Sequence, residues 1–284
     1  MPTATDVRRS KILEGVDAIP PFPEVASRVL SLAQDPDSSA ADLARAVSRD
    51  ASLTSSVLRA ANSAAMGSRD PVTGLPEAVV RLGIRSVRDL VVVDCLPASR
   101  RQAPGMVQRQ LWMHSVATAL CCRAIGVFLH GPDPEWDFLA GLFHDVGRMH
   151  LNDLFPQVYQ KFWESELSDS GWIQAERAAF GIDHAELGGA ILARWDLSKE
   201  LQQAVSQHHR SPAELSGTSL RVAAADEMTK TPLPDSAEEI QLTAPESVES
   251  ACGELGLVGE SFDDFAARVT PLVVREIQIF ASIP

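Results

Sequence analysis

The amino-acid sequence predicts an all-α protein. Apolar residues recur three and four positions apart along most of its 284 residues, as on the buried face of an amphipathic helix. Runs of β-branched residues are few, and one of them, Val91-Val92-Val93, lies inside a stretch with helical spacing. With 45% hydrophobic and 22% charged residues, the chain has ordinary globular composition. Its length allows one large domain or two smaller ones.

The N-terminal half predicts a series of short helices. The segment Ile19-Pro-Pro-Phe-Pro23 cannot be helical internally, because a proline disfavours the α conformation of the residue before it. Residues 1–18 are polar, and we expect little order there ahead of residue 12. Ser39 and Asp50 are typical N-cap residues, and each precedes a stretch with helical spacing. Five helices are expected, over residues 24–34, 40–48, 51–64, 76–82 and 86–96.

The C-terminal half continues the helical pattern. Residues 98–105 have the composition of a linker. Asp183 and Glu186 have capping-box spacing, and Ser198 is a further N-cap. Pro271 is expected to kink or divide the last helix. The expected helices cover residues 111–129, 135–151, 154–167, 172–180, 185–195, 199–209, 220–230 and 262–279.

These patterns predict three parts. We expect an N-terminal helical lobe over residues 1–105, a second helical lobe over 106–230, and an acidic linker with a C-terminal helix over 231–284. The linker is indicated by a shift to Pro, Ser and Glu after Lys230, with no Lys or Arg before Arg268. Such a composition favours a solvated segment.

The charge and the cysteines exclude several classes of partner and compartment. A net charge of −13 argues against nucleic-acid or anionic-membrane binding, since both need concentrated positive charge. We read one run of arginines as a solvated helix face plus a basic linker, where a small anionic partner could dock: Arg81, Arg85, Arg88, Arg100, Arg101 and Arg109. The four cysteines show no CxxC spacing and no disulfide framework: Cys95, Cys121, Cys122 and Cys252. The adjacent Cys121 and Cys122 lie in an apolar helical stretch and favour core thiols in a reducing compartment. With no signal peptide and no apolar run of membrane-spanning length expected, we predict a cytoplasmic protein.

One pair of polar residues stands out in an apolar segment. His144 and Asp145 lie side by side within residues 139–151, LAGLFHDVGRMHL, which read as part of a buried helix. A buried carboxylate is costly unless a cation or several donors compensate it. The sequence therefore leaves open which groups compensate the charge of the Asp145 carboxylate.

Other histidines and an aspartate supply candidate ligands. These are His114, His184 in the pattern H-x-x-x-G, His208, His209 and Asp226. Imidazole and carboxylate suit Zn²⁺, Fe or Mn²⁺, and an aspartate can bridge two cations. Neighbours on a helix point about 100° apart, so the ligands would have to converge from separate helices, as in a four-helix core. Alternatively, each histidine is a hydrogen-bonded core residue, or a C-terminal residue that favours the helix dipole. His130 and His150 are expected on the surface.

The order of these residues resembles the HD superfamily of metal-dependent phosphohydrolases. In histidine count it is closest to the HD-GYP cyclic-dinucleotide phosphodiesterases. Upstream and intervening segments resemble an HDOD domain from about residue 13 to 212 and on to Asp226. Six segments carry this resemblance: Ile19-Pro-Pro-Phe-Pro, Asp35-Pro-Asp-Ser-Ser, Leu58-Arg-Ala-Ala-Asn-Ser-Ala, Ala78-Val-Val-Arg-Leu-Gly, Trp112-x-His-Ser and Phe180-Gly-Ile-Asp-His-Ala-Glu-Leu-Gly.

The resemblance implies a two-lobed, all-α output module of bacterial signal transduction, with an HD-superfamily helical core in its C-terminal lobe. It also implies one or two transition-metal ions (Fe, Mn or Zn). One ion would take His114, His144, Asp145 and Asp226; a second would share Asp145 and take His184, His208 and His209. Arg148 stands at the lysine of the family's HD-x-G-K motif and would contact phosphate. After His209 comes Arg-Ser-Pro, without the GYP sequence.

Three functions follow from this reading. The first, which we favour, is a regulatory module that acts by binding a signalling protein, without catalytic turnover. The second is a binuclear phosphohydrolase acting on a nucleotide or cyclic dinucleotide. The third is a metal-dependent sensor that keeps the ligands and lacks the chemistry.

Overall fold

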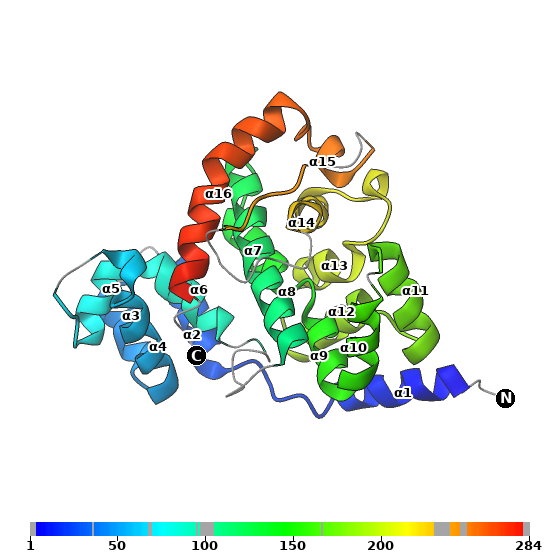
Figure 1. The fold of residues 1–284 in the computed structure, drawn as a ribbon. Helices are drawn as coiled ribbons and strands as arrows, with labels where there is room; N and C mark the ends of the chain where they lie inside the picture. Colours follow the sequence, from blue (N-terminus) through cyan, green and yellow to red (C-terminus); the bar gives the residue numbers. More distant parts are fainter. Residues whose placement is uncertain are drawn as a thin grey trace. The chain divides into compact units, whose positions relative to one another are not determined.

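The computed structural model describes residues 4–35, 37–67, 70–94, 96, 105–165, 167–229, 239–244 and 249–280. Helices make up the regular structure of these residues, which include no strand (Figure 1). The all-α class expected from the sequence is confirmed. Cys95 and most of the predicted linkers (97–104, 230–238 and 245–248) lie outside the described residues, as do Arg100 and Arg101.

The contacts within the chain define two compact units. The larger unit comprises Met1–Ile19 and Pro104–Val273, and the smaller unit comprises Pro20–Ala103 and Val274–Pro284. The C-terminal helix α16 (Glu260–Phe280) contributes residues to both, and it continues through Pro271. The domain boundaries expected at residues 105 and 230 stay a prediction.

The smaller unit is built from short capped helices. They are α2 (Glu24–Gln34), α3 (Ala40–Val47), α4 (Ala51–Ala61), the 3-10 helix η1 (Ala64–Met66), α5 (Leu75–Leu82) and α6 (Ile84–Val93). Ser39 caps α3 through a capping box with Asp42, and the Asp50 carboxylate accepts from Ser52 N and Leu53 N. Gly83, with φ +83°, joins α5 directly to α6, so α6 begins two residues earlier than expected.

The arginine run is not a uniformly solvated face. Arg88 is buried, and its Nη2 and Nε lie 2.6 and 2.9 Å from Asp89 Oδ1. Arg81 donates to the carbonyl of Asp70 at 2.9 Å. The solvated-face interpretation is therefore wrong for Arg88, because this arginine pairs with a buried carboxylate.

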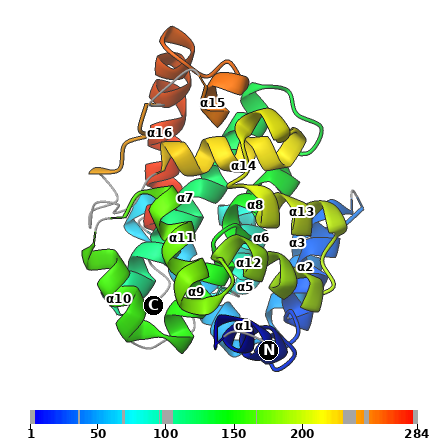
Figure 2. The same cartoon turned by 90° about the vertical axis from the view of Figure 1, so that its right-hand side faces the viewer.

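The larger unit surrounds one long helix, α7 (Met106–Phe128), which packs against α8, α9, α10 and α14 (Figure 2). The other elements are α1 (Ala4–Val16), α8 (Pro134–Phe143), α9 (Val146–Leu154), α10 (Pro156–Glu164), α11 (Asp169–Phe180), α12 (His184–Arg194), α13 (Lys199–Gln207), η2 (Pro212–Glu214), α14 (Gly217–Met228) and α15 (Ala251–Glu254).

Helix α7 is long and apolar enough to cross a membrane, so the expectation that no apolar run reaches that length is wrong. However, 72% of its most apolar window is buried within the protein, as in a core helix. Cys121 and Cys122 are buried free thiols, as expected, and Cys252 is a buried free thiol as well.

The N-terminal segment is more ordered than its polarity suggested. Helix α1 begins at Ala4, and Ile12 and Val16 are buried. Arg8 donates to the carbonyl of Ala179 at 2.8 Å, and Arg9 pairs with Glu186. Contacts with α11 and α12 thus stabilise a helix that local composition does not favour.

The single helix expected over residues 135–151 is wrong. The chain forms α8 and α9 instead, and the break falls on His144 and Asp145. Asp145 leaves the helical conformation, with φ −102° and ψ 14°. No glycine or proline causes this break, so tertiary contacts of the two side chains override the local helical pattern.

Helices α9 and α12 cross very closely, which brings Asp145 beside His184. Gly147 and Gly188 face each other at the crossing. A Cβ atom at Gly147 would lie 3.0 Å from His184 C and 2.8 Å from Gly188 N. Real Cβ atoms essentially never come within 3.0 Å of another heavy atom, and the neighbours here are backbone. Residue 147 must therefore be glycine for this crossing.

We predict that Gly147→Ala lowers the free energy of unfolding by about 3 kcal/mol, because the added methyl group overpacks two helix backbones. Urea denaturation followed by circular dichroism measures this loss. The control is Gly15→Ala in α1, where nothing lies within 4 Å of the new Cβ. That variant should be unchanged or more stable by about 0.5–1 kcal/mol. Similar losses in both variants would contradict the close crossing.

Candidate metal centre

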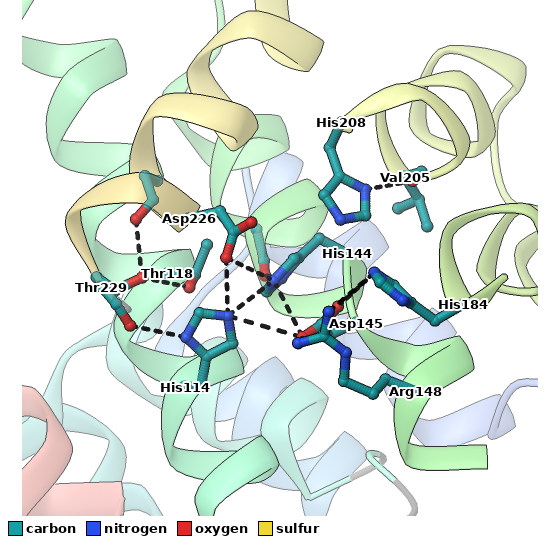
Figure 3. A network of polar contacts seen from close by, with 12 residues as sticks. His114, Thr118, His144, Asp145, Arg148, His184, Val205, His208, Asp226 and Thr229 are labelled. Atoms are coloured by element: carbon teal, nitrogen blue, oxygen red, sulfur yellow. Dashed lines mark hydrogen bonds and ion pairs between the residues drawn. The ribbon is translucent and has the colours of Figure 1, made fainter. Parts of the chain in front are cut away.

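The eight predicted site residues all lie in the larger unit, on six helices or at their ends. His114 lies on α7, His144 and Asp145 lie at the α8–α9 break, and Arg148 lies on α9. His184 begins α12, His208 and His209 follow α13, and Asp226 lies on α14. The labelled members converge on one point (Figure 3). The structure thus brings together the residues that the sequence singled out, and their role as ligands stays a prediction.

Four of these residues form what we call the acceptor cluster: His114, His144, Asp145 and Asp226. His114 Nε2 lies 3.1 Å from His144 Nε2, 3.0 Å from Asp226 Oδ1 and 3.7 Å from Asp145 Oδ2. His144 Nε2 lies 3.6 Å from both Asp226 Oδ1 and Asp145 Oδ2. The ligand atoms of His114, His144 and Asp226 therefore lie close enough together to hold a metal ion, and Asp145 Oδ2 faces both imidazoles.

Backbone carbonyls determine how the two imidazoles are protonated. His114 Nδ1 lies 2.8 Å from the carbonyl oxygen of Thr229, and His144 Nδ1 lies 2.7 Å from that of Gly141. A carbonyl oxygen only accepts, so each Nδ1 must carry the proton. In the neutral rings both Nε2 atoms then present lone pairs, at only 3.1 Å from each other. Such a pair needs either an extra proton or a cation between the rings.

A second group, the histidine cluster, consists of His184, His208 and His209. Their ring nitrogens lie close enough together to hold a metal ion. His184 Nε2 lies 2.8 Å from His209 Nε2 and 3.2 Å from Asp145 Oδ1, so Asp145 faces both clusters. His208 Nδ1 donates to the carbonyl of Val205 at 2.6 Å, and its buried Nε2 has no hydrogen-bond partner among the described residues.

Arg148 lies between the two clusters. Its Nη1 is 3.0 Å from Asp145 Oδ2, and its Nη2 is 3.3 Å from His184 Nε2. The guanidinium is buried, 5.2 Å from the centre of the Trp172 ring. Despite this ion pair, neither oxygen of Asp145 receives a hydrogen bond of good geometry within the described part of the chain.

Glu176 is a site residue that sequence reasoning missed. Its Oε2 accepts from the backbone N of His184 at 2.8 Å and lies 2.7 Å from His184 Nδ1. Tyr159 Oη donates to Glu176 Oε1 at 2.5 Å. A carboxylate on an imidazole Nδ1 orients the ring and leaves Nε2 as the free lone pair. Glu176 belongs to no sequence motif that would have identified it. On an amphipathic helix, a glutamate is expected on the solvated face.

The pKa directions favour ionised carboxylates and neutral His208 and His209. Burial alone would raise the pKa of Asp145, but the Arg148 guanidinium and the neighbouring histidines hold it well below its usual range. Burial would also raise the pKa of Asp226, and its contacts with His114 and His144 lower it instead. Burial lowers the pKa of His208, and it lowers that of His209 to about 3. His144 is the exception, because burial lowers its pKa but Asp145, Asp226 and the Gly141 carbonyl together raise it.

The centre is almost closed to solvent. His144 and Asp145 are 0% and 1% exposed, whereas the Asp226 side chain is 18% exposed. Asp226 is therefore the most exposed side chain of the acceptor cluster. Outside the centre, His130 is exposed as expected, and His150 is half-buried.

The donor set fits a transition-metal ion. The bare Asp145 oxygens and the unpartnered His208 Nε2 are buried polar atoms, and such atoms are costly unless something binds them. Imidazole nitrogen and carboxylate oxygen are ligands that Zn²⁺, Fe and Mn²⁺ accept.

Comparisons with known proteins agree on one family. The model of the HDOD domain matches residues 19–211. An uncharacterised protein of Treponema pallidum is 26% identical over an alignment of 223 residues, and the match covers 74% of this chain. The match covers only 41% of that relative.

Solved structures agree with the fold. Three of them superpose with a TM-score of 0.68. One is a candidate phosphohydrolase from Shewanella amazonensis, 20% identical, with 97% of this chain and 99% of the other covered. The second is an HDOD domain protein of unknown function from Geobacter sulfurreducens, 24% identical, with 98% and 96% covered. The third is a candidate signal-transduction protein from Marinobacter aquaeolei, 22% identical, with 98% and 64% covered.

The family model spans more than half of the chain, and the resemblance to an HDOD domain predicted from the upstream and intervening segments is confirmed. This chain belongs to the HDOD domain family.

Proposed function

We propose that this HDOD protein is a regulatory module of signal transduction whose larger unit binds a divalent transition-metal ion without catalysing hydrolysis. The observation that carries this proposal is the acceptor cluster. Each of its four facing atoms is a lone-pair donor to a metal, and the two imidazoles have their protons fixed on the opposite nitrogen.

The spacing of the acceptor cluster supports a shared ion. Metal–ligand bonds of about 2.1 Å place neighbouring ligand atoms about 3.0 Å apart at right angles and about 3.4 Å apart at the tetrahedral angle. The five measured separations run from 3.0 to 3.7 Å. His114, His144 and Asp226 would therefore hold the ion with little rearrangement, and Asp145 faces both imidazoles as a further candidate ligand. When bound, an ion there would supply Lewis-acid chemistry.

Three features argue against turnover. The centre is nearly closed, and Asp226 is the most exposed side chain of the acceptor cluster. Both terminal nitrogens of Arg148 face protein groups, so contact with a phosphate would require the loss of those contacts. The sequence after His209 also lacks the GYP segment of the related phosphodiesterases. A regulatory role through a signalling-protein partner, or through a nucleotide-type ligand, fits these features best.

A binuclear phosphohydrolase is the second candidate, favoured by one observation. The histidine cluster lies beside the acceptor cluster and faces the same Asp145 carboxylate, as a second ion would require. If a nucleotide or cyclic dinucleotide were the substrate, the protein would have to open to admit it.

We predict that purified protein reconstituted with Mn²⁺, Zn²⁺ or Fe²⁺ under reducing conditions retains a stoichiometric metal ion. Asp226→Asn should weaken binding at least about 100-fold, because it removes a charged ligand while keeping its shape. Saturating metal should stabilise the wild type, by about 2.7 kcal/mol at 100 times the dissociation constant, and stabilise the variant far less. Elemental analysis and thermal melts measure both effects.

The matched control is His130→Ala, which removes an exposed histidine outside the centre. It should bind metal like the wild type. Metal-free wild-type protein after reconstitution would end the metal-binding proposal and leave a network of protonated imidazoles as the explanation of the cluster.

We also predict that metal-loaded wild type and Asp145→Asn hydrolyse a generic phosphodiester at the same background rate. The reason is that no substrate reaches the closed centre. Release of nitrophenol from bis(4-nitrophenyl) phosphate measures the rate. A wild-type rate that the substitution abolishes would support the phosphohydrolase and contradict a purely regulatory role.

A further inference from the structure

The two clusters differ in what faces their lone pairs. In the acceptor cluster the two imidazoles turn proton-free Nε2 atoms toward the carboxylates, and each ring carries its proton on Nδ1. In the histidine cluster His184 also carries its proton on Nδ1, which faces Glu176. Its Nε2, however, accepts from the guanidinium of Arg148 at 3.3 Å. Arg148 Nη1 also lies 3.0 Å from Asp145 Oδ2, so this guanidinium is a cation already placed where the two clusters meet.

We propose that the Arg148 guanidinium acts as the built-in second cation of this centre, so that the larger unit takes one metal ion rather than two. This inference rests on the proposed metal-binding function and specifies its stoichiometry. Arg148 is then a residue that determines metal occupancy, instead of the phosphate ligand expected from its sequence position.

The position of Arg148 supports this role. A second ion would have to bind Asp145 and His184 together, because these two groups face each other at 3.2 Å. The guanidinium already spans the same pair, with one nitrogen on each partner. A guanidinium is a planar fork that can contact two groups at once, and it stays charged when buried.

Arg148 is also fixed in place. It lies three residues after Asp145, at the start of α9, so the two side chains share one face of that helix. Its guanidinium faces the Trp172 ring, and its side chain is only 7% exposed. A mobile cation could yield to a metal ion, whereas this one is held by packing.

The test is the number of Mn²⁺ ions bound per chain, measured by elemental analysis after reconstitution and gel filtration. We expect one ion in the wild type and two in Arg148→Ala. Arg148→Gln is a second variant that removes the charge but keeps a polar side chain, in case the alanine variant does not fold. Electron paramagnetic resonance gives an independent readout. The wild type should show an isolated Mn²⁺ spectrum, and the variants an exchange-coupled one, as for ions about 3.5–4 Å apart.

Two controls locate the effect. Arg194→Met removes an exposed arginine of the same unit and should still bind one ion. Arg148→Ala combined with His209→Ala should return from two ions to one, because the second ion loses a ligand of the histidine cluster. Two ions in that double variant would place the extra ion elsewhere and reject the proposal.

The outcomes separate this inference from the proposed function. Two ions in the wild type would keep metal binding and overturn the role of Arg148. One ion in the wild type and in both Arg148 variants would also overturn it. No ion in the wild type would defeat the proposed metal function itself, and this inference with it.

Discussion

The larger unit depends on one constraint, which is that the carboxylate of Asp145 is buried and charged. A buried carboxylate needs compensation, and the chain around it supplies partners from several directions. The helix breaks at Asp145, Arg148 pairs with it one turn later, and the α9–α12 crossing at Gly147 brings His184 to its other side. The fold of this unit is in this sense arranged around a single negative charge.

The imidazoles are preorganised for ligand binding. Four histidine Nδ1 atoms face acceptors, which are the carbonyls of Thr229, Gly141 and Val205 and the Glu176 carboxylate. Each of these contacts fixes both the ring orientation and the nitrogen that keeps its lone pair. The conformational cost of ordering four rings is thus met by folding, and a ligand needs little further rearrangement to bind.

Local rules predicted much of the fold, and long-range packing decided the rest. The caps at Ser39, Asp50, Asp183 and Ser198 all formed as expected, because N-cap chemistry depends on a few neighbouring residues. The convergence of His114 with Asp226 also followed from their order, through the family resemblance. The break between α8 and α9 and the contact of Glu176 with His184 could not be predicted from the sequence, because both arise from contacts between separate helices. Arg148 was identified from its motif, but its partners depend on the crossing of α9 and α12.

The hydrogen bond from His114 to Thr229 links the centre to the end of a helix. Thr229 is the C-cap of α14, and its hydroxyl is bonded to Thr118 on α7 and to the carbonyl of Ala225. If the last turn of α14 unwinds, the His114 ring loses the acceptor that keeps its proton on Nδ1. The proton can then move to Nε2, and a lone pair directed at the centre becomes an N–H group. A mechanical event at one helix terminus would thereby change the affinity of the centre for a cation, and cation binding would in turn brace that terminus.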